Sequence, residues 1–160
     1  MKMHFDKPDV IPFFRGYWQD WNGVDWVLVE EWQCRIAMPY KEKPVEFIII
    51  AKPGTRTDFG SIPKFARGWI NKMGLGMVGF LPHDMICGCK YFTRHFNDNV
   101  MRACHRWAKL STIKNEAMYH AVRWAGSGYQ DHTEKSIRLH REHIDIIPII
   151  GITKKDIIHS

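Results

Sequence analysis

The sequence predicts an α+β fold, in which a short antiparallel strand pair or small sheet leads into a body of three to four helices. The composition, 45% hydrophobic and 25% charged over 160 residues, is typical of a globular domain with a buried core. Residues 25–51 show the two-residue alternation of β-strands, whereas apolar residues after position 54 recur at helical spacing. This change of period separates a strand-forming part of the chain from a helical part.

Two strands are predicted in the first third of the chain. Alternate residues from 26 to 36 are apolar, except Glu30, and they predict one strand over residues 25–38. Residues 39–44 begin and end with proline and are expected to form a turn. Residues 45–51 are mainly β-branched or aromatic and predict a second strand, antiparallel to the first.

The helix that carries His83 and Asp84 is predicted to begin at Pro82, because proline lacks the N–H group that the first helical position leaves unbonded. His83 and Asp84 then occupy its first turn. A short helix within residues 63–73 and a flexible connection containing glycines 74, 76 and 79 are expected before it.

Three further helices are predicted. Residues 97–110 form the strongest, with an inward face of Val100, Met101, Cys104 and Ala108. The next is capped by Ser111 or Thr112 and ends at Gly126. A short polar helix over residues 133–143 precedes an Ile-rich tail, which is either a final strand or a partner-binding segment.

The chain divides into an aromatic-rich N-terminal arm (residues 1–24), a single α+β domain (residues 25–130), and a polar helix with the Ile-rich tail (residues 131–160). No signal peptide or membrane span is evident. The net charge of +6 is spread without a basic block, so nucleic-acid binding is not favoured. The four cysteines follow no disulfide framework and are expected to be reduced and buried, and a zinc site on Cys87 and Cys89 would lack the usual paired spacing.

Three polar segments form the candidate site. They contain Thr57, Asp58 and Ser61, then His83 and Asp84, then Arg94 and Asp98. His83, with an ordinary pKa of about 6.5, is predicted as a catalytic base. Asp98 lies at the edge of an apolar helix face and needs a partner, for which His83, Arg94 and Arg123 are candidates. Two interpretations stay open: Asp98 orients a catalytic His83, or it forms a structural ion pair between helices.

Asp58 and Asp84 are predicted as ligands of a divalent cation such as Ca²⁺ or Mg²⁺, which prefers carboxylate oxygens. The alternative is structural: Asp84 would interact with a helix N-terminus, and Asp58 would cap a turn. Structural or substrate-binding roles are predicted for Thr57, Ser61, Arg94 and Arg123. Ser61 is not favoured as a nucleophile, since the nucleophile-elbow pattern is absent.

The motifs follow one another in a distinctive order. They are Pro53-Gly54, Thr57-Asp58 with Ser61-Ile62-Pro63, His83-Asp84, Arg94 with Asp98, and Ala121-Val122-Arg123 with Gly126. Over residues 26–126 this order resembles the domain-of-unknown-function family 1353, small proteins of tailed phages and prophages. Thr55 replaces the family's usual hydrophobic residue, and Met85-Ile86 stands where an aromatic is usual. The resemblance implies a phage or prophage origin, a location in the host cytoplasm or the virion, and a compact α+β domain, but no established activity.

A fainter likeness concerns small secreted phospholipases of the A-two type. These enzymes place a His-Asp pair on one helix and the histidine's aspartate partner on another. The likeness implies His83 as base, Asp98 as its orienting residue and Asp84 as a calcium ligand. The disulfides and the glycine-rich calcium loop of those enzymes have no counterpart in this chain.

Two functions are therefore predicted. The first is a hydrolase in which His83 activates a water molecule against a cell-envelope or host polymer. The alternative is a non-enzymatic virion or tail component, or a host-interaction protein, in which the polar cluster is structural. Its N-terminal arm or C-terminal tail would bind other phage structural proteins, a host protein or a second copy of the chain.

Overall fold

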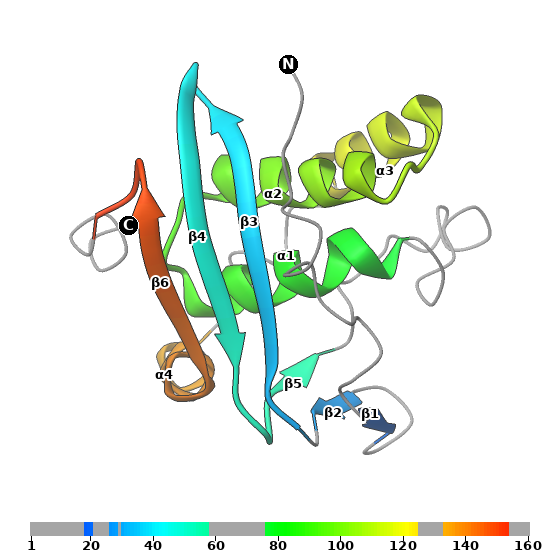
Figure 1. Cartoon of the computed structure of the whole chain (residues 1–160). Coiled ribbons are helices and arrows are strands. Elements are labelled where there is room, and N and C mark those ends of the chain that lie inside the picture. Colours follow the sequence, from blue (N-terminus) through cyan, green and yellow to red (C-terminus); the bar gives the residue numbers. More distant parts are fainter. Residues whose placement is uncertain (1–17, 21–25, 29, 58–75, 125–132, 154–160) are drawn as a thin grey trace.

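The computed structural model describes residues 18–20, 26–28, 30–57, 76–124 and 133–153. The elements are β1 (Trp18–Asp20), β2 (Trp26–Leu28), β3 (Trp32–Tyr40), β4 (Lys43–Ala51), β5 (Arg56–Thr57), α1 (Met77–Cys89), α2 (Arg94–Trp107), α3 (Thr112–Trp124), α4 (Glu134–His143) and β6 (Ile144–Ile150). Figure 1 shows α1 and α2 behind a three-stranded sheet, which confirms the predicted α+β class. Most of the predicted arm and the predicted helix at 63–73 lie outside the described residues.

The main sheet has the strand order β3-β4-β6, and both strand pairs are antiparallel. Lys41 and Glu42 alone connect β3 to β4, with positive φ angles of 48° and 64° that suit a tight hairpin. The predicted turn over residues 39–44 is too long, because Pro39 and Pro44 lie opposite each other within the strands. The Ile-rich tail forms β6 and pairs with β4, which is the first of its two predicted alternatives.

The prediction of a single strand over residues 25–38 is wrong, because this segment contains two strands that belong to different sheets. β2 lies between β1 and β5 in a second, smaller sheet. Leu28 ends β2 and exchanges backbone hydrogen bonds with the β4–β5 connection, at Thr55 and Gly54. The exposed Glu30 therefore marks a break between sheets. β1 also gives regular structure to a part of the chain that was predicted to be irregular.

Helix α1 begins at Met77 rather than at Pro82, which lies inside it and removes one backbone hydrogen bond. Gly76 and Gly79, in the predicted flexible connection, take part in close packing, whereas Gly74 lies outside the described residues. A Cβ atom on Gly79 would lie 2.4 Å from the His105 ring, and the Gly76 carbonyl accepts a hydrogen bond from His105 Nε2 at 2.9 Å. These contacts with α2 hold the first turns of α1, so His83 lies in the middle of the helix.

The other helices follow the predicted order. Helix α2 begins at Arg94 instead of residue 97, because the Thr93 hydroxyl caps it by accepting from the Phe96 amide at 3.3 Å. Ser111 and Thr133 cap α3 and α4 in the same way. Within the described residues, no helix is long and apolar enough to cross a bilayer.

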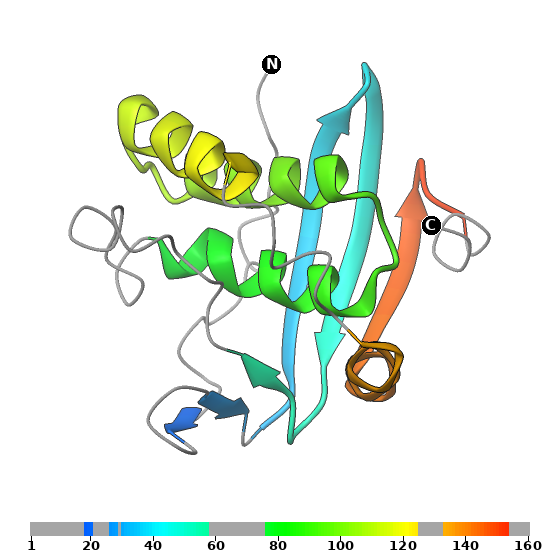
Figure 2. The same ribbon diagram turned by 180° about the vertical axis from the view of Figure 1, so that it is seen from behind.

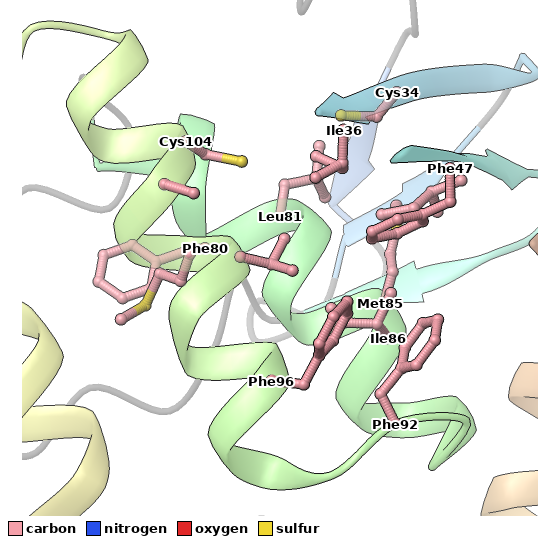
Figure 3. Close-up of a cluster of buried hydrophobic side chains, with 14 of the residues drawn as sticks. Cys34, Ile36, Phe47, Phe80, Leu81, Met85, Ile86, Phe92, Phe96 and Cys104 are labelled. Carbon is pink, nitrogen blue, oxygen red and sulfur yellow. The ribbon is translucent and has the colours of Figure 1, made fainter. Parts of the chain in front are cut away.

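The core lies between the main sheet and the pair α1–α2, which run across the strands on one face (Figure 2). Apolar side chains on alternate positions of β3 and β4 point into it, and those of α1 and α2 meet them (Figure 3). Phe47, Phe92 and Phe96 form a ring cluster with centroids 4.5 to 5.8 Å apart. This core fixes the relative position of α1 and α2, and with it the polar residues between them.

Candidate functional site

The predicted contact between His83 and Asp98 is present. Nε2 of His83, on α1, lies 2.9 Å from Oδ1 of Asp98, on α2. Asp98 has no solvent exposure, and His83 is 9% exposed. A carboxylate in such a position is tolerated only with charged or hydrogen-bonding partners, because an unpaired buried charge is strongly unfavourable. The two helices therefore meet at a buried ion pair.

Both arginines proposed as partners of Asp98 also lie at this site. Arg123 Nη1 lies 3.1 Å from Asp98 Oδ2, and Arg94 Nε lies 3.9 Å from the same oxygen. Arg94 also donates through Nη2 to the carbonyl oxygens of Val122 and Arg123, at 2.7 and 2.6 Å. These are among the last carbonyls of α3, which lack partners within the helix. The arginines thus join the C-terminal end of α3 to Asp98.

The protonation of His83 follows from its neighbours. Burial alone would favour the neutral imidazole, but the Cys87 sulfur and the Asp98 carboxylate favour the imidazolium more strongly and raise the pKa of His83 to about 10. The ring is therefore cationic at neutral pH. It suits ion pairing and proton donation there, and it can accept a proton only at alkaline pH.

Cys87 and Asn97 complete the buried cluster, and neither was predicted as a site residue. Cys87 Sγ lies 3.5 Å from Nε2 and 3.8 Å from Nδ1 of His83. The Asn97 side-chain amide donates to the same sulfur at 3.3 Å. Cys87 stands four residues after His83, one helical turn away. Both residues lie within the helix predicted from Pro82, so that spacing was a signal that could have indicated the contact.

The predicted cation site is only partly described. Asp84, half-buried, accepts a short hydrogen bond through Oδ2 from the Thr57 hydroxyl, which ties α1 to β5. Asp58 and Ser61 lie outside the described residues. Within those residues, no three His, Cys, Asp or Glu side chains form a group suited to a metal ion. A divalent cation at Asp58 and Asp84 stays a prediction.

The cluster therefore contains an acid, a histidine and a thiol in contact. Asp98 holds one nitrogen of His83, so the ring has a fixed orientation, and Nδ1 does not face the carboxylate. Such an arrangement can move a proton between the ring and a neighbouring thiol, water or substrate atom. The same contacts also suit a structural clamp between three helices.

Comparison with known proteins identifies the chain by family. Residues 32–122, more than half of the sequence, match the family described as "Protein of unknown function (DUF1353)". No curated protein and no solved structure matches the chain. The matched region extends from β3 to the last turn of α3 and contains His83, Asp98 and Arg94. The chain belongs to the DUF1353 family of proteins of unknown function.

Proposed function

We propose that the protein is a phage-type hydrolase in which His83 is the acid–base residue. The observation that carries the proposal is the buried contact of 2.9 Å between His83 Nε2 and Asp98 Oδ1. This contact orients the ring and leaves Nδ1 for exchange of a proton with water or substrate. The resemblance to phage proteins supports a cell-envelope or other host polymer as the substrate.

The raised pKa of His83 sets the pH dependence of this activity. With a pKa of about 10, only a small fraction of His83 is neutral at pH 7, and that fraction grows about tenfold for each pH unit. If the slow step requires His83 as a base, the rate should rise with pH up to about 10. A rate that falls over the same interval would identify the imidazolium as the active form.

A panel of envelope substrates tests the proposal. We would follow release of soluble fragments from dye-labelled cell-wall sacculi and of fatty acid from phospholipid vesicles. His83→Gln should lower an observed activity by at least 100-fold, since glutamine can still donate to Asp98 but cannot exchange a proton. The matched control is His120→Gln, the same change at an exposed site on α3. Activity retained in a folded His83→Gln protein would contradict the hydrolase proposal.

A second candidate function is that of a non-enzymatic phage or host-interaction protein. It is favoured by β6, an outer strand of the main sheet, on which Ile147, Ile149 and Ile150 are 44%, 46% and 45% exposed. Exposed apolar side chains on an outer strand commonly mark contacts with another chain. In this alternative, the ion pairs around Asp98 act only as a clamp.

Deleting the tail would not test this alternative cleanly, because β6 pairs with β4 and its loss would disturb the fold. The paired substitution Ile147→Lys and Ile149→Lys instead changes two exposed side chains. Light scattering should show that the wild-type chain self-associates and that the double variant does not. Leu139→Lys, at an exposed apolar position of α4, is the control and should associate normally. A monomeric wild type would remove the support for self-association through β6.

A further inference from the structure

The Cys87 thiol lies between two polar side chains, those of His83 and Asn97. We propose that Cys87 is the nucleophile of the site and that it takes up an acyl group from a carboxylic ester or thioester. The inference deepens the proposed hydrolase function and rests on it. In this inference Cys87 carries out the nucleophilic attack, and His83 transfers protons.

The geometry of α1 and α2 supports this assignment. Asp98 holds His83 through Nε2, so Nδ1 is the nitrogen that does not face the carboxylate. Cys87 Sγ lies 3.5 Å from Nε2 and 3.8 Å from Nδ1, so the sulfur lies beside the ring, within the range of a hydrogen bond to either nitrogen. Acid, imidazole and thiol are thus in contact, and an imidazole oriented by an acid lies beside the proposed nucleophile.

Asn97 supplies a second and independent observation. Its side-chain amide donates to Cys87 Sγ at 3.3 Å, which stabilises negative charge on the sulfur. Asn97 has no solvent exposure, and its Oδ1 atom has no hydrogen-bond partner among the described residues. Buried unpaired acceptors are rare and call for an explanation. A donor group on a bound substrate would provide one.

The other three cysteines differ from Cys87 in their surroundings. Burial raises the pKa of Cys34, Cys89 and Cys104, and no histidine–sulfur hydrogen bond is present at any of them in the described part of the chain. Thiols of this kind react slowly, because the thiolate is the nucleophilic form. They provide internal controls within the same molecule.

The proposed reaction balances without any external oxidant or reductant. His83 is already protonated at neutral pH, so the Cys87 proton passes to the solvent while Sγ attacks the carbonyl carbon of the ester. The bond from carbon to the leaving oxygen or sulfur then breaks, and His83 gives its proton to the leaving group. A water molecule that gives a proton to the now neutral His83 hydrolyses the thioester, and the sulfur takes a proton from the solvent to regenerate the thiol. The net change is ester and water to acid and alcohol.

Alkylation kinetics test the activation of Cys87 without knowledge of the substrate. The folded chain is treated with iodoacetamide at pH 7.5, and the modification of each cysteine is followed by mass spectrometry of its peptide. Cys87 should react at least tenfold faster than the other three. It should also react faster in the folded chain than in the chain unfolded in urea, whereas the buried controls should react more slowly when folded.

Exposure alone is a competing explanation, because Cys87 is 8% exposed and the other three cysteines are at most 2% exposed. The variant His83→Gln separates the two explanations. Activation by His83 requires the Cys87 rate to fall at least tenfold in this variant. An unchanged rate, or slower alkylation of Cys87 in the folded than in the unfolded wild type, overturns the proposal. The second comparison needs no variant, so it remains decisive if His83→Gln does not fold.

Acyl transfer is then tested with p-nitrophenyl acetate as the probe. The wild type should release a burst of p-nitrophenol and carry an acetyl group on Cys87, and Cys87→Ala should do neither. If Cys87→Ala still hydrolyses the envelope substrates while His83→Gln does not, the nucleophile assignment fails and the hydrolase proposal stands. If Cys87 is acetylated but no envelope substrate is cleaved, the assignment stands and the proposed substrate class fails.

Discussion

Asp98→Asn removes a charge that three cationic side chains surround while it keeps the size of the side chain. Asp98 has no solvent exposure, and its carboxylate meets His83 at 2.9 Å and Arg123 at 3.1 Å. Loss of one member of a buried ion pair typically costs about 3–5 kcal/mol, because the remaining charge is left uncompensated. His83 can lower that cost by releasing its proton.

The protonation of His83 sets the size of the effect at each pH. Burial lowers the pKa of His83, but the Cys87 sulfur and Asp98 together raise it to about 10, so release of the proton is costly at pH 7. At pH 9 the same release is much less costly, because the cost falls with each unit by which the pH approaches the pKa. We therefore expect Asp98→Asn to lower the free energy of unfolding by about 3–5 kcal/mol at pH 7 and by a smaller amount at pH 9.

Urea unfolding at the two pH values measures this difference, with circular dichroism as the signal. Glu116→Gln is the matched control, since Glu116 pairs with Arg102 but is 30% exposed. Its effect should stay below about 1 kcal/mol at both pH values. An equal loss for Asp98→Asn at pH 7 and pH 9 would refute the reasoning, because the cost would then be independent of the His83 proton.

Two further predictions concern close packing and acid stability. Gly88→Ala should destabilise the protein by about 1–3 kcal/mol, because its Cβ would lie 2.3 Å from the His140 ring on α4. In a His140→Ala background the same change should instead stabilise by up to about 1 kcal/mol through helix propensity. Urea unfolding of the four proteins measures both effects, and the same sign in both backgrounds would contradict the packing argument. Burial lowers the pKa of His105, so the unfolded chain binds a proton before the folded one does. The contribution of His105 to stability should therefore fall as the pH drops below about 6.5, whereas the raised pKa of His83 acts in the opposite direction. Between pH 7 and pH 5.5 the urea midpoint of the wild type should fall relative to that of His105→Gln, and an equal change in the two proteins would contradict this prediction.

The second strand of the predicted pair, the start of α3 and both ends of α4 were predictable because they depend on local periodicity and capping. The alternation at residues 45–51 and the capping residue Thr133 predicted bounds for β4 and α4 that lie within two residues of the observed ones. The start of α1 was not predictable in this way. Pro82 is a strong local signal for a helix start, but contacts of Gly76 and Gly79 with His105, which is distant in sequence, outweigh it.

For the candidate site, the sequence by itself determined the partners of Asp98. An acid on an apolar helix face requires cations, and the three candidates were His83, Arg94 and Arg123. All three lie at the Asp98 carboxylate. The sequence did not determine that Asp98 is completely buried, since exposure depends on how α1, α2 and α3 pack together.

Only the tertiary structure decided the role of the remaining groups. It brought Cys87 and Asn97 to the His83 ring, paired Asp84 with Thr57, and made the Ile-rich tail a strand of the main sheet. The physical reason is the range of the interactions. Propensity and capping act between residues a few positions apart, whereas burial, charge pairing and strand pairing act between segments that meet only after the chain has folded.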